Sequence, residues 1–151
     1  MNVHTQFYTY GETAQDRLSL QDGSSFGPIT LAYETFGTLN ESKSNAILLF
    51  HALSGSQHAA GNNAVVDAAG DRWTSECQTG WWDAFIGSGE ILDTDNYFII
   101  CCNYFGGCYG STGPSSINPA TDKPYGGDFP HVQFSDIVDA QLPLFNHLGI
   151  D

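Results

Sequence analysis

The sequence predicts an α/β domain whose open sheet begins with antiparallel strands and continues with parallel ones. Residues 29–37 alternate in side-chain character, which is typical of a strand with one buried face. Two short apolar runs, 46–50 and 97–103, are typical of parallel strands that are covered on both faces. A long connection follows each run, as the crossovers of an open α/β sheet require, and we expect a crossover helix between the parallel strands.

The first expected pair of strands is a hairpin. Residues 17–26, RLSLQDGSSF, indicate a strand that runs into an Asp-Gly turn. In 29–37, ITLAYETFG, one face of the strand carries Ile29, Leu31, Tyr33 and Thr35. We expect these two segments to pair with each other.

The parallel strands are expected at 46–50, AILLF, and at 97–103, YFIICCN. Cys101 and Cys102 are neighbours in the second strand, so their side chains face opposite ways and cannot bind one ion. The chain has four cysteines but no C-x-x-C motif. We therefore expect buried, reduced thiols and no metal site.

A helix is expected at 134–149, FSDIVDAQLPLFNHLG. Ser135 is a suitable N-cap, Asp136 suits the positive N-terminal end, and Gly149 suits the C-terminal cap. Pro143 removes one backbone hydrogen bond and should kink the helix. The side chains expected along its apolar side are Ile137, Val138, Gln141, Leu144, Phe145 and Leu148.

The connections 51–96 and 104–133 are long and contain one short helical pattern at most, at 81–87. Long loops in a compact domain are usually functional. Both begin where a parallel strand ends, and open α/β sheets place their ligands at that edge. The aromatic residues of the first loop are expected to pack in the core or to cap the sheet; they are Trp73, Trp81, Trp82 and Phe85.

The charge is strongly acidic, with 4 Lys and Arg against 17 Asp and Glu and a formal net charge of −13. Such a field repels phosphate backbones and anionic lipids, so we expect neither a nucleic-acid partner nor a membrane partner. The apolar runs are shorter than the ~20 residues that a membrane span needs. The N-terminus lacks the basic and apolar regions of a signal peptide, so we expect a cytoplasmic location.

The segment 51–61, HALSGSQHAAG, follows the first parallel strand. Its small residues could leave backbone N–H groups facing a cleft, where they would stabilise an oxyanion; the alternative is a tight turn without chemistry. His51 and His58 lack a metal-binding spacing, and a histidine at a strand end more often forms a local hydrogen bond than acts as a base.

The glycine-rich segment 103–119 matches neither a dinucleotide-binding fingerprint nor a phosphate-binding P-loop. Cys108 lies within it but has no cationic neighbour that would activate the thiol. A nucleophile elbow of the form G-x-S-x-G is absent from the sequence.

Taken together, the motifs LAYETFGTLN, LLFHALSGSQHAAG, GWWDAFIGSGEILDTDNYFIICCNYFGGCYGSTGPSSINP and DIVDAQLPLFNHLGI closely resemble the homoserine O-acetyltransferase family of the α/β-hydrolase superfamily. The resemblance runs from about residue 15 to the end of the sequence. It implies transfer of an acetyl group from acetyl-CoA to the hydroxyl of L-homoserine, an early step of methionine biosynthesis. The family uses a Ser–His–Asp triad and an acyl-serine intermediate.

The resemblance also assigns the site loop. The family motif H-A-L-T-G maps onto residues 51–55, with Ser54 in place of the usual Thr. It implies that the Leu53 backbone N–H is one oxyanion-hole donor. It further implies that Ala52, Ser54 and Gly55 help to select the amino-acid substrate.

By the same resemblance, residues 1–151 are the N-terminal portion of a single α/β-hydrolase domain that is truncated before the nucleophile elbow. The triad and the lid would lie outside it, so we expect this piece to be inactive. The substrates would be L-homoserine and acetyl-CoA as co-substrate, with no other cofactor, and the full-length enzyme would be a homodimer. Cationic groups that hold CoA are expected mostly outside this piece.

Two alternatives stay open at this stage. A related enzyme would use succinyl-CoA as donor or serine as acceptor. A non-catalytic, truncated protein is the second alternative. In every case we expect the sheet to end on an unpaired, apolar edge strand, which favours aggregation.

Overall fold

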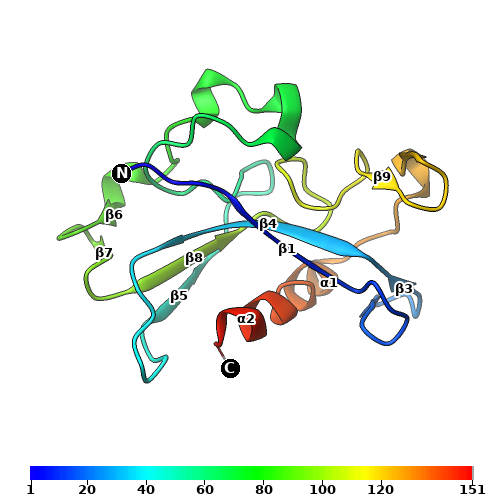
Figure 1. Ribbon diagram of the computed structural model, residues 1–151, viewed down its shortest axis with the longest axis horizontal. Coiled ribbons are helices and arrows are strands. Elements are labelled where there is room, and N and C mark those ends of the chain that lie inside the picture. The colour runs from blue at the N-terminus through cyan, green and yellow to red at the C-terminus, as the bar shows by residue number, and fades with distance from the viewer. Residues whose placement is uncertain (151) are drawn as a thin grey trace.

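The computed structural model describes residues 1–150, and its centre is a four-stranded mixed sheet (Figure 1). The strand order is β1 (Gln6–Tyr10), β4 (Ile29–Phe36), β8 (Phe98–Cys102) and β5 (Ala46–Leu49). β4 pairs antiparallel with both β1 and β8, whereas β5 pairs parallel with β8. An antiparallel start followed by parallel strands is therefore confirmed.

The expected hairpin between 17–26 and 29–37 is wrong. Residues 17–26 fold back on themselves, because β2 (Leu18–Ser19) pairs with β3 (Ser25–Phe26) around the Asp-Gly turn. The Asp22 carboxylate stabilises this turn by accepting the Ser24 backbone N–H at 2.8 Å. β4 pairs instead with β1, from Tyr10 opposite Ile29 to Gln6 opposite Tyr33.

The expected crossover helix between β5 and β8 is also absent from the described residues. The connection contains the 3-10 segments η1 (Asp67–Arg72), η2 (Ser75–Cys77) and η3 (Asp83–Phe85), and the short parallel pair β6 (Ile86–Gly87) and β7 (Leu92–Asp93). Gly70 interrupts η1 with a φ of 55°, which a helix cannot accommodate. The 81–87 segment is thus one 3-10 turn followed by a strand.

The second long connection is similar. β9 (Ile117–Asn118) pairs antiparallel with β10 (Lys123–Pro124), and the 3-10 segment η4 (Gly126–Asp128) follows. No described helix is long and apolar enough to cross a membrane.

The core is divided between the two faces of the sheet. Cys102 belongs to the cluster that contains Leu31 and the helix residue Leu144, whereas Cys101 belongs to the cluster that contains Ile99 and the loop residue Ala59. The adjacent cysteines therefore face opposite ways, as predicted. Burial raises the pKa of the Cys101 thiol to about 12, so this group stays protonated.

The strand at 46–50 is less buried than predicted. Its residues 46–49 are half-buried, and the side chain of Phe50 is 53% exposed. In contrast, Ile99–Cys102 of β8 are buried, because β8 has a neighbouring strand on each side. β5 lies at the sheet edge with β8 as its single partner among the described residues.

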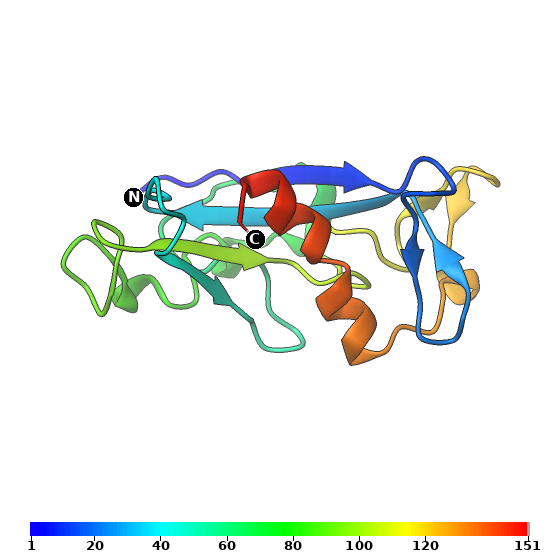
Figure 2. The ribbon, with the colours of Figure 1, turned by 90° about the horizontal axis from the view of Figure 1, so that it is seen from below.

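The C-terminal helix is broken into α1 (Phe134–Asp139) and α2 (Leu142–Leu148), which lie on one side of the sheet (Figure 2). Pro143 sits in the first turn of α2, so the predicted interruption is confirmed. Gly149 ends α2 in the left-handed conformation, with a φ of 77°, as predicted.

The start of this helix differs from the prediction. The N-cap is Gln133 rather than Ser135, and the Gln133 N–H donates to the Asp136 carboxylate at 2.7 Å. Asp136 also accepts the Gln21 backbone N–H and is fully buried. In the first turn of α1 the side chain that points into the protein is that of Asp136. Val138 lies on another side of the helix and is 47% exposed, so it does not belong to the apolar side as predicted.

Candidate functional site

The two long loops meet at the edge where the parallel strands end. His51 follows β5 and Tyr104 follows β8, and their rings stack with centroids 3.8 Å apart. The Tyr104 hydroxyl donates to the His51 carbonyl oxygen at 2.6 Å. The parallel pairing of β5 and β8 therefore brings the predicted site loop and the glycine-rich loop together, as the sequence indicated.

His51 is buried and forms a local hydrogen bond. Its Nδ1 lies 2.6 Å from the carbonyl oxygen of Ala52, which accepts the ring proton. Burial lowers the pKa of His51, and the hydrogen bond to Ala52 only partly opposes this effect. The ring is therefore neutral, and its buried Nε2 has no hydrogen-bond partner among the described residues. This geometry supports the local role over that of a base.

Gly55 closes a tight turn by donating its N–H to the Ala52 carbonyl at 2.7 Å. A Cβ at this position would lie 3.1 Å from the Ala52 oxygen and 3.1 Å from the His51 Cβ. The turn therefore packs its backbone closely against His51, which explains why the segment needs a small residue there.

Three of the predicted site residues line one cavity of about 290 Å³: Ala52, Ser54 and Gly55. His58, Trp81 and Tyr109 complete part of its wall. The loops that follow β5 and β8 thus share this cavity, although they lie far apart in the sequence.

Leu53 lies apart from that cavity. Its side chain is 78% exposed and lines two other hollows, together with Val132 and Ile137. Within residues 1–150, its backbone N–H donates to no acceptor. The structure therefore brings Ala52, Ser54 and Gly55 together and leaves the Leu53 N–H available to a ligand.

Sequence reasoning missed a buried ion pair beside this cavity. The Glu34 carboxylate lies 2.7 Å from His58 Nδ1, and both side chains are inaccessible to solvent. The other Glu34 oxygen accepts hydrogen bonds from Thr5 Oγ1 at 2.8 Å and from Asn63 Nδ2 at 2.9 Å. The signal was present, because a charged residue within the apolar strand 29–37 must find a partner when buried.

The surroundings of His58 suit a ring that carries both protons. Its Nε2 faces the Gln78 carbonyl oxygen at 3.0 Å, so both ring nitrogens face groups that only accept. Burial by itself would lower the pKa of His58, but the hydrogen bond and the charge of Glu34 outweigh burial and raise it. This pair ties the segment 51–61, which contains the site loop, to β4.

The glycine-rich loop is tied to β4 as well. The Ala32 N–H donates to Ser111 Oγ at 2.9 Å, and that hydroxyl donates to the Asn103 carbonyl at 2.7 Å. The Thr30 N–H donates to Thr112 Oγ1 at 2.8 Å. Cys108 carries an exposed thiol in this loop.

Of the two arrangements predicted for the loop aromatics, packing in the core is wrong for three of them. Trp81, Trp82 and Phe85 are 38%, 45% and 47% exposed and contact one another at the surface. Trp73 is the more buried exception and packs edge-on against His58. The connection that carries these side chains contains only short 3-10 segments and the two-residue strands β6 and β7.

No protein-family model matches the chain. It is 53% identical over 149 residues to a homoserine O-acetyltransferase of Methanohalobium evestigatum, covering 99% of this chain and 28% of that relative. It is 47% identical over 148 residues to the homoserine O-acetyltransferase of Moorella thermoacetica, covering 98% of this chain and 36% of the relative. The chain belongs to the homoserine O-acetyltransferase family.

Solved structures agree with this family assignment. The crystal structure of homoserine O-acetyltransferase from Bacillus anthracis superimposes with a TM-score of 0.76 and 33% identity, over 99% of this chain and 38% of that one. The crystal structure of esterase E22 superimposes with a TM-score of 0.78 and 35% identity, over 98% of this chain and 38% of that one. The α/β-hydrolase fold expected for a homoserine O-acetyltransferase is thereby confirmed. The chain spans about a third of the length of the relatives it matches.

Proposed function

We propose that residues 51–55 form the oxyanion loop and part of the acceptor pocket of an enzyme that transfers an acetyl group from acetyl-CoA to the hydroxyl of L-homoserine. The observation that carries this proposal is the identity of about half to homoserine O-acetyltransferases over nearly the whole chain. The unpaired Leu53 N–H at the end of β5 supports the proposed role of the loop.

In the proposed reaction, a serine oxygen attacks the thioester carbonyl of acetyl-CoA, and the Leu53 N–H donates to the developing oxyanion. Collapse of this intermediate expels CoA as the thiol and leaves an acyl-serine. The homoserine hydroxyl then attacks the acyl-serine, and the same N–H stabilises the second oxyanion. Collapse of this second intermediate breaks the bond to the serine oxygen, releases O-acetylhomoserine and returns the hydroxyl proton of homoserine to the serine. We place the serine, its histidine and its aspartate outside residues 1–151, so this piece by itself should not convert the substrates.

The acceptor would occupy the cavity of about 290 Å³ beside Ala52, Ser54 and Gly55. The Ser54 hydroxyl could bond a polar group of the substrate, and the neutral His51 ring and Tyr109 would provide apolar walls. We propose that the reaction needs no metal or prosthetic group, because a serine nucleophile and an activated thioester suffice for acyl transfer.

The test is a chimera in which residues 1–151 replace the matching segment of the Moorella relative. Its activity is followed by release of CoA thiol, with acetyl-CoA or succinyl-CoA as donor and L-homoserine or L-serine as acceptor. We expect turnover with acetyl-CoA and homoserine, and none from residues 1–151 alone. A folded chimera that prefers serine or succinyl-CoA would contradict the proposed substrates.

Ester hydrolysis is a second candidate, because esterase E22 superimposes as well as the acetyltransferase does. In that case water would replace homoserine as the acceptor. Acetate release from p-nitrophenyl acetate that homoserine does not suppress would favour the hydrolase, whereas formation of O-acetylhomoserine would favour the transferase.

We further propose a cytoplasmic location and a homodimer for the whole enzyme. The free thiols of Cys77, Cys101, Cys102 and Cys108 suit a reducing compartment. Light scattering of the purified chimera would report the oligomeric state, and a fluorescent fusion in the source cells would report the location.

A further inference from the structure

A second cavity, of about 450 Å³, lies beside the first. Its wall is formed by the glycine-rich loop, by the start of β4 and by the end of η1, and it includes Arg72, Cys108, Gly110, Thr112, Ser115 and Ser116. Tyr109 lines the first cavity, while its neighbours Cys108 and Gly110 line the second. One short segment therefore separates the two cavities, so a long ligand could reach from one to the other.

The charge of the second cavity is opposite to that of the chain. The sequence has 17 acidic residues and a net charge of −13, yet neither Asp nor Glu lines this cavity. Arg72 does line it, and the Arg72 guanidinium makes no ion pair with any residue in the part of the chain that is described. An unpaired guanidinium in a strongly acidic protein favours an anionic ligand at this place.

Two hydroxyl groups of the cavity, those of Thr112 and Ser116, each accept a backbone N–H. Thr112 Oγ1 accepts the Thr30 N–H at 2.8 Å, and Ser116 Oγ accepts the Gly113 N–H at 3.0 Å. Neither hydroxyl donates to an acceptor within residues 1–150, so both protons stay available to a ligand. A wall that offers O–H donors and a guanidinium matches the oxygens of a phosphate group.

The backbone adds further donors. The N–H groups of Cys108, Gly110 and Ser111 donate to no acceptor in the described part of the chain. Gly110 has a φ of 116°, and a Cβ there would lie 3.0 Å from the Ala32 Cβ, so the loop passes close over the sheet. Successive free N–H groups in a turn with positive φ can form a concave anion site.

We infer that this cavity is a phosphate-binding subsite for the nucleotide end of the acyl donor, with Arg72 as its cationic group. The inference rests on the proposed function, in which the acyl end of the same donor lies at the oxyanion loop. The cationic group of this subsite, Arg72, belongs to residues 1–151. The acidic composition had instead suggested that the cationic groups that hold CoA lie mostly outside this piece. Free inorganic phosphate shares the chemistry of the ligand, so the experiment must separate the two sources.

The test measures binding to residues 1–151 by isothermal titration calorimetry. The probes are adenosine 3′,5′-bisphosphate, inorganic phosphate and unphosphorylated adenosine. We expect the bisphosphate to bind more tightly than phosphate, and adenosine not to bind. Arg72→Gln should weaken bisphosphate binding about tenfold or more, the effect of losing one charge-assisted hydrogen bond.

Lys43→Gln is the matched control. Lys43 is exposed, its side chain lies near Gly149 at the end of α2, and it does not line the second cavity. Equal weakening by both substitutions would show non-specific attraction and would overturn the inference. So would tight binding of adenosine, an inorganic phosphate affinity equal to that of the bisphosphate, or no binding of the bisphosphate.

The chimera separates this inference from the proposed function. If Arg72→Gln raises the KM for acetyl-CoA and leaves the KM for homoserine unchanged, both proposals are supported. If the chimera folds but lacks transferase activity while Arg72-dependent bisphosphate binding persists, the proposed function fails and the subsite remains. An active chimera whose KM for acetyl-CoA is insensitive to Arg72→Gln would overturn the subsite alone.

Discussion

Glu34 and His58 form a fully buried ion pair in which the carboxylate lies 2.7 Å from the ring Nδ1. The pair joins β4, in the sheet, to the segment 51–61 that contains the site loop. Thr5, Asn63 and Gln78 satisfy the remaining oxygen of Glu34 and the remaining nitrogen of His58. The loop that begins at His51 is therefore held at its start by stacking on Tyr104 and near its end by this pair.

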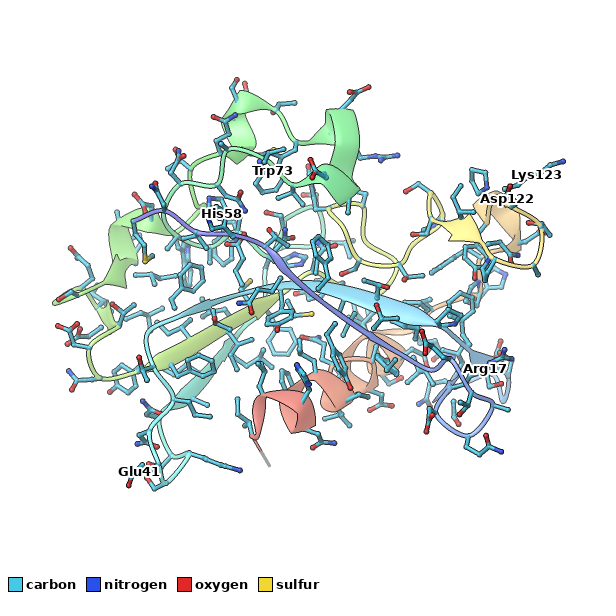
Figure 3. The ribbon with its side chains drawn as sticks, in the orientation of Figure 1. Arg17, Glu41, His58, Trp73, Asp122 and Lys123 are labelled. Carbon is cyan, nitrogen blue, oxygen red and sulfur yellow. The ribbon has the colours of Figure 1, made fainter. Side chains whose placement is uncertain are left out.

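Removing one charge of this pair should be costly. Glu34→Gln leaves the His58 ring buried without its counter-ion, and loss of one partner of a buried pair typically costs about 3–5 kcal/mol. We expect a large drop in the urea midpoint of residues 1–151. Glu41→Gln is the control, because Glu41 is exposed and lies far from His58 (Figure 3). Equal midpoints for the two variants would contradict this role of the pair.

The same pair predicts a pH dependence of stability. The pKa of His58 is raised above its ordinary value of 6.5, so the folded state binds this proton more tightly than the unfolded state. The resulting stabilisation is complete below pH 6.5 and is lost as the pH rises through the higher folded pKa. The measurement is the free energy of unfolding in urea across this range for the wild type and for His58→Gln.

We expect the difference in the free energy of unfolding between the wild type and His58→Gln to shrink as the pH rises. His51 contributes in the opposite direction and in another window, because its lowered pKa costs stability as the pH falls below 6.5. A wild-type advantage that grows above pH 6.5 would show that the His58 ring is neutral in the folded state.

Leu53 should act through its backbone rather than its side chain. In the chimera, Leu53→Pro removes the N–H and should lower kcat by about 10²–10³-fold, the typical effect of losing one oxyanion donor. Leu53→Ala keeps the N–H and removes a side chain that is 78% exposed, so kcat should change little. Equal losses of kcat in the two variants would assign the effect to the side chain instead.

Gly55 should tolerate a methyl group poorly. In Gly55→Ala the new Cβ would meet both Ala52 and His51 at 3.1 Å, and overpacking of this kind costs about 1–3 kcal/mol. The matched control is Gly127→Ala, because a Cβ at Gly127 meets nothing within 4 Å. Thermal unfolding of both variants checks this, and a Gly55→Ala midpoint equal to that of the control would show that the turn relaxes freely.

The edge strand β5 should promote association of residues 1–151. Among the described residues, its outer side has no partner strand, and Phe50 beside it is 53% exposed. We expect light scattering to rise with concentration, and Phe50→Lys to reduce it. Ile91→Lys removes another apolar side chain, 78% exposed, away from this edge and should have little effect. A wild type that stays monomeric as its concentration rises would contradict the prediction.

Local and repetitive features of this protein were determined by the sequence. The apolar runs 46–50 and 97–103 contain the parallel strands β5 and β8, because short continuous apolar segments favour strands of a parallel sheet. Pro143 divided the C-terminal helix and Gly149 ended it, because these residues restrict or free their own backbone wherever they lie. The site loop at 51–55 was found through its resemblance to a family, and the structure places it where the parallel strands end.

Long-range partnerships were decided by the tertiary structure. β4 pairs with β1 rather than with the nearer segment 17–26, because the strands within that segment pair with each other around an Asp-Gly turn. Glu34 met His58, and Arg72 came to face the hydroxyls of the glycine-rich loop, through contacts between segments that no local pattern connects. Periodicity states which side of an element is buried, but the free energy of burial depends on the neighbour, and only the folded chain supplies that neighbour.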